Sequence, residues 1–130
     1  MIAKPISLNK CDSLPYTSSS EGWPAAYENY KLEYCSADTA EHAKQKVEAL
    51  MKSYGDKSRA IVKVDWLCRN KGHLFIAENR KGVIYFVDPQ MGYLDASWYF
   101  DFIDPMSVVL LRTDILAFTK LSEKCFEVER

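Results

Sequence analysis

The chain of 130 residues lacks long hydrophobic runs. Its apolar runs are short, as at 108–111 (VVLL), whereas a helix that spans a bilayer needs about 20 apolar residues. The first ten residues also lack the apolar stretch of a secretory signal. We therefore expect a protein that makes no use of a membrane and acts in the cytoplasm.

Cysteines are few and widely spaced, at positions 11, 35, 68 and 125, and no C-x-x-C motif occurs. Small secreted domains held by disulfides are usually richer in cysteine, so we expect reduced thiols. Cys68 and His73 have no further ligands at the spacing of a zinc finger. The sequence therefore predicts neither a metal nor an organic cofactor.

A marked net charge is also missing, because 17 basic residues stand against 18 acidic ones. Bulk electrostatics then favours neither nucleic acid nor an anionic membrane as a partner. No internal repeat and no low-complexity linker divides the chain. A length of 130 residues suits one domain, so we expect 1–130 to fold as a single unit.

The hydrophobic pattern predicts an α+β fold in which one main helix packs on a small antiparallel sheet. Residues 1–34 show no period and are expected to be irregular. Apolar residues recur every three or four positions in 36–54, Asp38-x-x-Glu41 resembles a capping box, and Gly55 stops the helix. A sheet region follows over 59–119, with predicted strands at 59–66, 73–78, 83–88 and 107–112 and a short helix at 95–103.

The stretch GHLFIAENRKGVIYFVDPQMG, residues 72–92, is predicted to form a hairpin at the centre of this sheet. If the turn covers 79–82, His73 lies directly opposite Asp88, within reach of a cross-strand contact. A carboxylate on one imidazole nitrogen fixes the tautomer and leaves the other nitrogen free to act as a base. The pattern thus predicts a catalytic type of pair at the open end of the hairpin.

Two further residues are candidates for the same site. Gln90 follows the second strand, and its amide either donates to an oxyanion or belongs to an ordinary turn. Cys35 is the one cysteine near the predicted helix start, where a helix dipole stabilises a thiolate. A buried, unreactive thiol is the alternative for Cys35.

Several runs resemble the papain-fold toxin family of glutamine deamidases, known from phage structural proteins and bacterial polymorphic toxins. These runs are SRAIVKVDW, the 72–92 hairpin with its Gly-His start and its D-P-Q-x-G end, YF and LLRTD, and the resemblance covers 14–119. It implies a papain-like fold and the conversion of glutamine side chains to glutamate by Cys, His and Asp. In this chain it implies His73 as the base, Asp88 as its orienter and Gln90 as an auxiliary polar group.

The resemblance fails at the nucleophile, which the family carries in an Asn-Cys motif at the head of a helix. Asn9-Lys10-Cys11 is not followed by the amphipathic run that such a helix needs. We therefore expect a pseudoenzyme, a phage-type module that binds a host protein inside a bacterial cell, such as an anti-CRISPR-like inhibitor of a defence protein. The alternatives are a cysteine-dependent deamidase or protease that uses Cys35, His73 and Asp88, and an enzyme fragment completed by another chain. The sequence is compatible with an enzyme and with a non-catalytic module, and it does not define an oligomeric state.

Overall fold

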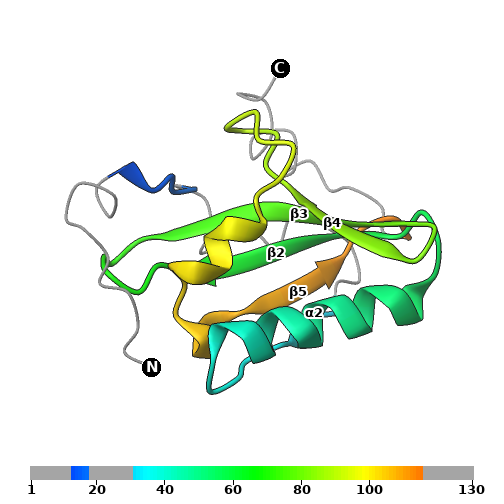
Figure 1. Ribbon diagram of the computed structural model, residues 1–130, viewed down its shortest axis with the longest axis horizontal. Helices are drawn as coiled ribbons and strands as arrows, with labels where there is room; N and C mark the ends of the chain where they lie inside the picture. The colour runs from blue at the N-terminus through cyan, green and yellow to red at the C-terminus, as the bar shows by residue number, and fades with distance from the viewer. Residues whose placement is uncertain (1–12, 18–30, 116–130) are drawn as a thin grey trace.

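The structure is a computed structural model, and it describes residues 13–17 and 31–115. One main helix packs on a five-stranded antiparallel sheet, so the predicted α+β class is confirmed (Figure 1). In chain order the elements are β1 (Glu33–Tyr34), α2 (Ala40–Tyr54), β2 (Arg59–Asp65), β3 (Gly72–Arg80), β4 (Val83–Val87), η2 (Ser97–Asp101), η3 (Pro105–Ser107) and β5 (Val109–Arg112). Most of the predicted irregular region 1–34, and residues 116–119 of the predicted sheet region, lie outside the described residues.

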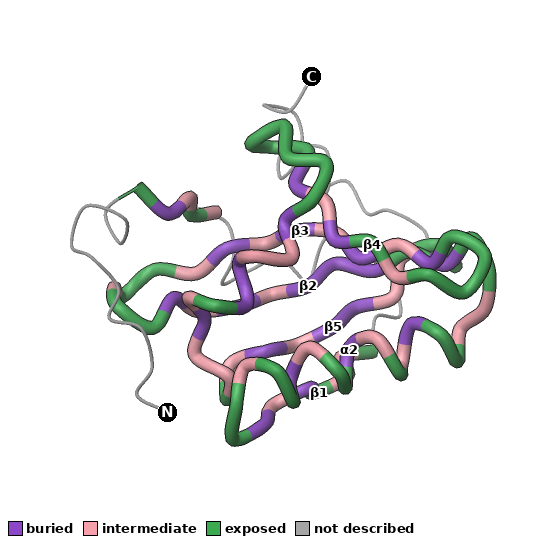
Figure 2. The backbone as a smooth tube through the Cα atoms, viewed as in Figure 1, coloured by how far each residue is buried: buried purple, intermediate pink, exposed green. Residues whose placement is uncertain are grey.

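The strand order of the sheet is β1-β5-β2-β3-β4, so β5, the last of the described strands, is inserted between the first two. Helix α2 lies along one face of the sheet and contributes the buried side chains Ala43, Val47 and Met51 (Figure 1). Figure 2 shows buried segments along the strands and along α2, whereas the β3–β4 turn is exposed. None of the described helices is long and apolar enough to cross a bilayer.

Helix α2 begins later than the sequence pattern predicts. Thr39 is the N-cap, and its hydroxyl accepts a hydrogen bond from the His42 amide at 3.1 Å. The apparent capping box at Asp38 placed the start too early, because Thr39 performs the same task. The helix ends where predicted, at Gly55, whose φ of +95° suits a residue without a Cβ.

The predicted register of the β3–β4 hairpin is wrong by two residues. Arg80 pairs with Val83, so the turn consists of Lys81 and Gly82 alone, with φ angles of 55° and 86°. Two left-handed residues make the turn that best matches the twist of a hairpin. A lysine at the first position hides this signal, because asparagine, aspartate or glycine usually marks it.

The slip of two residues leaves every side chain on its predicted face, because side chains in a strand alternate with a period of two. His73 and Asp88 therefore still share the face covered by α2, although they are diagonal rather than direct neighbours. Below them the core is aromatic, with Phe75, Phe86 and Phe100 in edge contacts at centroid distances of 5.0–6.2 Å. These packed rings form the part of the core on which His73 and Asp88 rest.

The remaining predicted elements are present with shorter bounds. The expected helix at 95–103 is the 3-10 turn η2, and the Asp95 carboxylate accepts from the Ser97 amide at 2.9 Å just before it. The expected strand at 107–112 is β5, in which Leu110 and Leu111 are buried. Turn η2 carries Tyr99 into the core next to the hairpin.

Candidate functional site

His73 and Asp88 meet at the end of the hairpin opposite the turn. The distance from His73 Nε2 to Asp88 Oδ2 is 2.7 Å, and both side chains are fully buried. His73 lies near the start of β3, where it pairs with Val64 of the neighbouring strand. The structure thus brings together the two residues that the sequence pattern predicts to meet.

The backbone after β4 folds back sharply to deliver Asp88. Asp88 and Tyr93 exchange two backbone hydrogen bonds of 2.9 Å, which closes a tight loop over residues 89–92. Gly92, at φ +74°, supplies the left-handed residue that this loop requires. The D-P-Q-x-G pattern therefore encodes a loop that holds the Asp88 side chain in place.

Asp88 receives three hydrogen bonds. The Tyr99 hydroxyl and His73 Nε2 both donate to Oδ2, and the Met91 amide donates to Oδ1 at 3.2 Å. Burial alone would raise the pKa of Asp88, but the hydrogen bonds from His73 and Tyr99 hold it below its ordinary value. Burial and the Asp88 carboxylate raise the pKa of Tyr99 above its usual range, so this hydroxyl stays protonated and donates.

The second ring nitrogen of His73 faces Thr17. Thr17 Oγ1 lies 2.9 Å from His73 Nδ1 and also accepts the Leu74 amide at 3.0 Å. Because an ionised Asp88 can only accept, the proton of the neutral ring lies on Nε2, and Nδ1 is then an acceptor. In this tautomer the one Thr17 hydroxyl proton goes to Nδ1 at 2.9 Å and not to Gln90 Oε1 at 3.5 Å. No sequence pattern pointed to Thr17, which is 56 residues away along the chain.

Aromatic rings fix the imidazole from two sides. Trp66 stacks on His73 with a centroid distance of 6.1 Å and an interplanar angle of 21°, and Tyr99 meets the ring edge-on at 5.7 Å. The Trp66 indole donates to the Pro15 carbonyl at 2.6 Å, which ties the 13–17 segment to the same site. A ring held in this way cannot rotate away from Asp88 without disturbing the core.

Gln90 lies at the rim of the site. Its Oε1 is 3.5 Å from Thr17 Oγ1, and the residue is exposed. Gln90, Thr17 and His73 therefore lie together at one end of the hairpin.

Cys35 directly follows β1, the strand at the edge of the sheet opposite to β4. Its amide donates to the Val108 carbonyl at 2.9 Å, and the strand registers put Cys35, Val108, Val64 and His73 in one row across four strands. Three steps of about 4.8 Å separate the two ends of that row by about 14 Å. The structure does not bring Cys35 to His73.

The Cys35 thiol also lacks the environment of a nucleophile. Burial, with a contribution from Glu33, raises its pKa to about 11, and its side chain is 3% exposed. A neutral, covered thiol of this kind is inert at neutral pH.

Cys68 differs from the sequence-based expectation. Its sulfur is disulfide-bonded, so the prediction of reduced thiols is wrong for this residue. Cys68 lies in the connection between β2 and β3, and the wide spacing of the cysteines gave no indication of a disulfide there. The bond also removes Cys68 as the zinc ligand considered beside His73.

A family model covers the part of the chain that carries this site. The model of the family described as papain fold toxin 1, glutamine deamidase, matches residues 8–93, which include His73, Asp88 and Gln90. No curated protein and no solved structure matches the chain. The fold and the site define a papain-fold protein of α+β class. The chain belongs to the papain fold toxin 1, glutamine deamidase family.

Proposed function

We propose that the chain is a cysteine-dependent amidohydrolase that converts glutamine side chains of a protein to glutamate. His73 is the base, Asp88 orients it, and Gln90 is an auxiliary polar group. The observation that carries this proposal is the bond between His73 Nε2 and Asp88 Oδ2 at 2.7 Å, because it leaves Nδ1 as the basic nitrogen.

The chemistry follows the pattern of a thiol hydrolase. The base takes the proton of a cysteine thiol, and the thiolate attacks the glutamine amide carbon. The C–N bond breaks, the imidazolium returns its proton to the leaving nitrogen, and ammonia departs. Water then attacks the thioester, His73 accepts its proton, and the products are glutamate and the free thiol.

The nucleophile in this proposal is Cys11. Cys35 lies about 14 Å from His73 by strand spacing, and Cys68 is disulfide-bonded. Of the two other cysteines, Cys11 and Cys125, only Cys11 lies within the residues that the family model matches. Because Cys35 is free, the proposal requires that the disulfide of Cys68 does not occupy Cys11 in the active protein. Cys11 precedes Thr17 by six residues, a length of chain that spans up to about 22 Å.

The proposed target is a protein of a bacterial host cell, and the proposed place of action is its cytoplasm. Disulfides such as that of Cys68 are typical of oxidising compartments. An enzyme that works in the cytoplasm must therefore keep its activity after this bond is reduced. Retained turnover in excess dithiothreitol supports the proposed location, and loss of turnover there contradicts it.

The test is ammonia release from a library of glutamine-containing peptides, with mass spectrometry to locate each new glutamate. Replacement of Cys11 by Ser, or of His73 by Ala, is expected to lower the rate by about three orders of magnitude or more. The matched control, Cys35→Ser, is expected to keep the wild-type rate. A Cys11→Ser protein as active as the wild type would contradict the assignment of the nucleophile.

The second candidate function is the non-catalytic one, a module that binds a host protein, such as an anti-CRISPR-like inhibitor. It is favoured by a specific observation, the Thr17 hydroxyl that occupies Nδ1 of a fully buried His73. Replacement of Thr17 by Ala separates the two functions. The enzyme is expected to keep or gain turnover once Nδ1 is uncovered, whereas a binding module shows no ammonia release in either form.

A further inference from the structure

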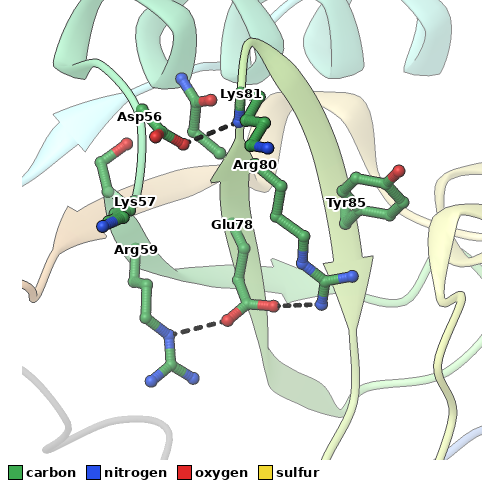
Figure 3. A pocket seen from close by; sticks show the side chains of 9 residues that line it. Asp56, Lys57, Arg59, Glu78, Arg80, Lys81 and Tyr85 are labelled. Atoms are coloured by element: carbon green, nitrogen blue, oxygen red, sulfur yellow. Dashed lines mark hydrogen bonds and ion pairs between the residues drawn. The ribbon is translucent and has the colours of Figure 1, made fainter.

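A hollow lies at the turn end of the same hairpin, which the proposed function does not use. It has a volume of about 570 Å³ and lies between the α2–β2 connection and the β3–β4 turn (Figure 3). We call it the turn pocket, lined by 56–59, 78–81 and Tyr85. A volume of this size suits a ligand or a short stretch of a larger partner.

Backbone hydrogen bonds connect the two walls of the turn pocket. The Lys57 amide donates to the Asn79 carbonyl at 2.8 Å, and the Asn79 amide donates to the Ser58 carbonyl at 2.9 Å. The Asp56 carboxylate accepts from the Lys81 amide at 2.7 Å (Figure 3). The walls are therefore held in place before any ligand binds, which reduces the entropy lost on binding.

The pocket carries an excess of positive charge. Its four cations are Lys57, Arg59, Arg80 and Lys81, against two carboxylates. Glu78 is neutralised by Arg59 at 3.0 Å and by Arg80 at 2.6 Å (Figure 3). Neither lysine forms an ion pair with a carboxylate of the described residues. Two ammonium groups thus remain for an anionic ligand.

Both lysines also occupy backbone positions that do not favour lysine. Lys57 has a φ of 69° and Lys81 a φ of 55°, in the left-handed region that asparagine and glycine adopt more easily. Lysine is less stable than asparagine or glycine at such a position, so its presence in both loops indicates a role for the two side chains. This observation is independent of the charge count and points to the same two residues.

We propose that the turn pocket binds an acidic segment of the protein substrate, at a distance from the glutamine that is modified. The inference rests on the proposed function and names its substrate class. Tyr85 connects the pocket to a second hollow, which also contains Leu94. Leu94 is 88% exposed and adjoins Tyr93, the backbone partner of Asp88. Edge strand β4 thus leads from the turn pocket to the loop of the candidate site.

An extended polypeptide fits this path by its length. Glu78 and His73 are five residues apart on β3, which corresponds to about 17 Å in a strand, and their side chains point to opposite faces of the sheet. An extended substrate chain that passes around edge strand β4 therefore needs at least about five residues between the two sites. The substrate is expected to carry its acidic residues at least about five positions from the target glutamine. Exposed Tyr85 and Leu94 supply apolar contacts in between.

The test measures binding without turnover, in the Cys11→Ser variant, which lacks the proposed nucleophile and keeps the buried His73–Asp88 pair. The probes are a fluorescent peptide with a glutamine and a run of glutamates that begins about five residues away and extends further, and a matched peptide with serines instead. Fluorescence anisotropy is expected to give about tenfold tighter binding for the glutamate peptide at low salt. Equal binding of the two peptides overturns the proposal.

The variant Lys57→Asn/Lys81→Asn removes both charges and places a favoured residue at each left-handed position, so its melting temperature is expected to stay or rise. It is expected to bind both peptides alike, whereas the control Lys52→Gln, on exposed α2 surface, keeps the tenfold preference. A preference that persists in the double variant overturns the proposal. Tighter binding of a single-stranded oligonucleotide that depends on both lysines also overturns it.

Turnover separates this inference from the proposed function. If the wild-type protein binds the glutamate peptide as expected but releases no ammonia from either peptide, the proposed function fails and the turn pocket remains a binding site. If ammonia is released from both peptides at equal rates and equal KM, the function stands and the docking role of the pocket is overturned.

Discussion

The two ends of the β3–β4 hairpin use charged groups in opposite ways. At one end His73 and Asp88 are fully buried, and Tyr99, Thr17 and Trp66 enclose them. At the other end the side chains of the turn pocket, such as Arg59 and Arg80, are each 54% exposed and share one carboxylate. The hairpin thus has a buried cluster of fixed geometry at one end and a solvent-exposed cluster of charged side chains at the other.

This difference shows how one small sheet can separate chemistry from recognition. A buried pair needs every hydrogen bond satisfied, because the loss of one partner leaves an uncompensated charge in a medium of low dielectric constant. An exposed cluster tolerates change, because water and salt replace any partner that is lost. The predictions below test this contrast from its largest expected effect to its smallest.

Replacement of Asp88 by Ala is expected to lower the free energy of unfolding by about 3–5 kcal/mol, because it removes one partner of a buried pair. Urea denaturation measures this directly. A loss below about 1 kcal/mol would mean that water reaches the pair and that the two ends of the hairpin do not differ as described.

Replacement of Tyr99 by Phe removes one donor to Asp88 and keeps the ring packing against Phe75 and Trp66. The expected loss is about 1–2 kcal/mol, the usual effect of a missing hydrogen bond to a charged group. Rescue of stability in the double variant Tyr99→Phe/Asp88→Asn, compared with the sum of the single changes, measures their coupling. Additive effects would contradict a direct bond between the two side chains.

Acid is expected to destabilise the protein through Asp88. The pKa of Asp88 in the fold is lower than in the unfolded chain, where it is about 3.9. Its stabilising contribution is therefore complete above that value and is lost as the pH falls through the lower pKa of the folded state. Wild type and Asp88→Asn are brought to the same free energy of unfolding at neutral pH with a mild denaturant. Circular dichroism is then expected to show that the free energy of unfolding falls less with decreasing pH in Asp88→Asn than in the wild type. An identical pH profile for both proteins would contradict this role.

Replacement of Glu78 by Gln at the turn end is expected to change the free energy of unfolding by only about 0.2–1 kcal/mol. The pairs with Arg59 and Arg80 are largely solvated, so the effect is expected to shrink further at high salt. A loss as large as that of Asp88→Ala, independent of salt, would show that the two ends are alike.

The sequence pattern predicted the helix, the hairpin and the meeting of His73 with Asp88, because these depend on local periodicity and on strand alternation. It missed the exact register, since Lys81 stands where a turn-forming residue was expected. It also missed Thr17, because contacts between remote segments leave no periodic signal. Cys35 was chosen because it is close to a helix start in the sequence. That closeness does not reveal that strands β5 and β2 lie between Cys35 and His73 in the sheet.

The central claim is that His73 presents Nδ1 as a base because Asp88 holds the proton of Nε2. Nitrogen NMR of the protein labelled at histidine measures this tautomer directly. The prediction is a protonated Nε2 and an unprotonated Nδ1 in the neutral ring, with Nδ1 gaining the proton in Asp88→Ala. A proton on Nδ1 in the wild-type neutral ring would contradict the account, because the nitrogen that faces Thr17 would then have no lone pair to accept a proton from a nucleophile.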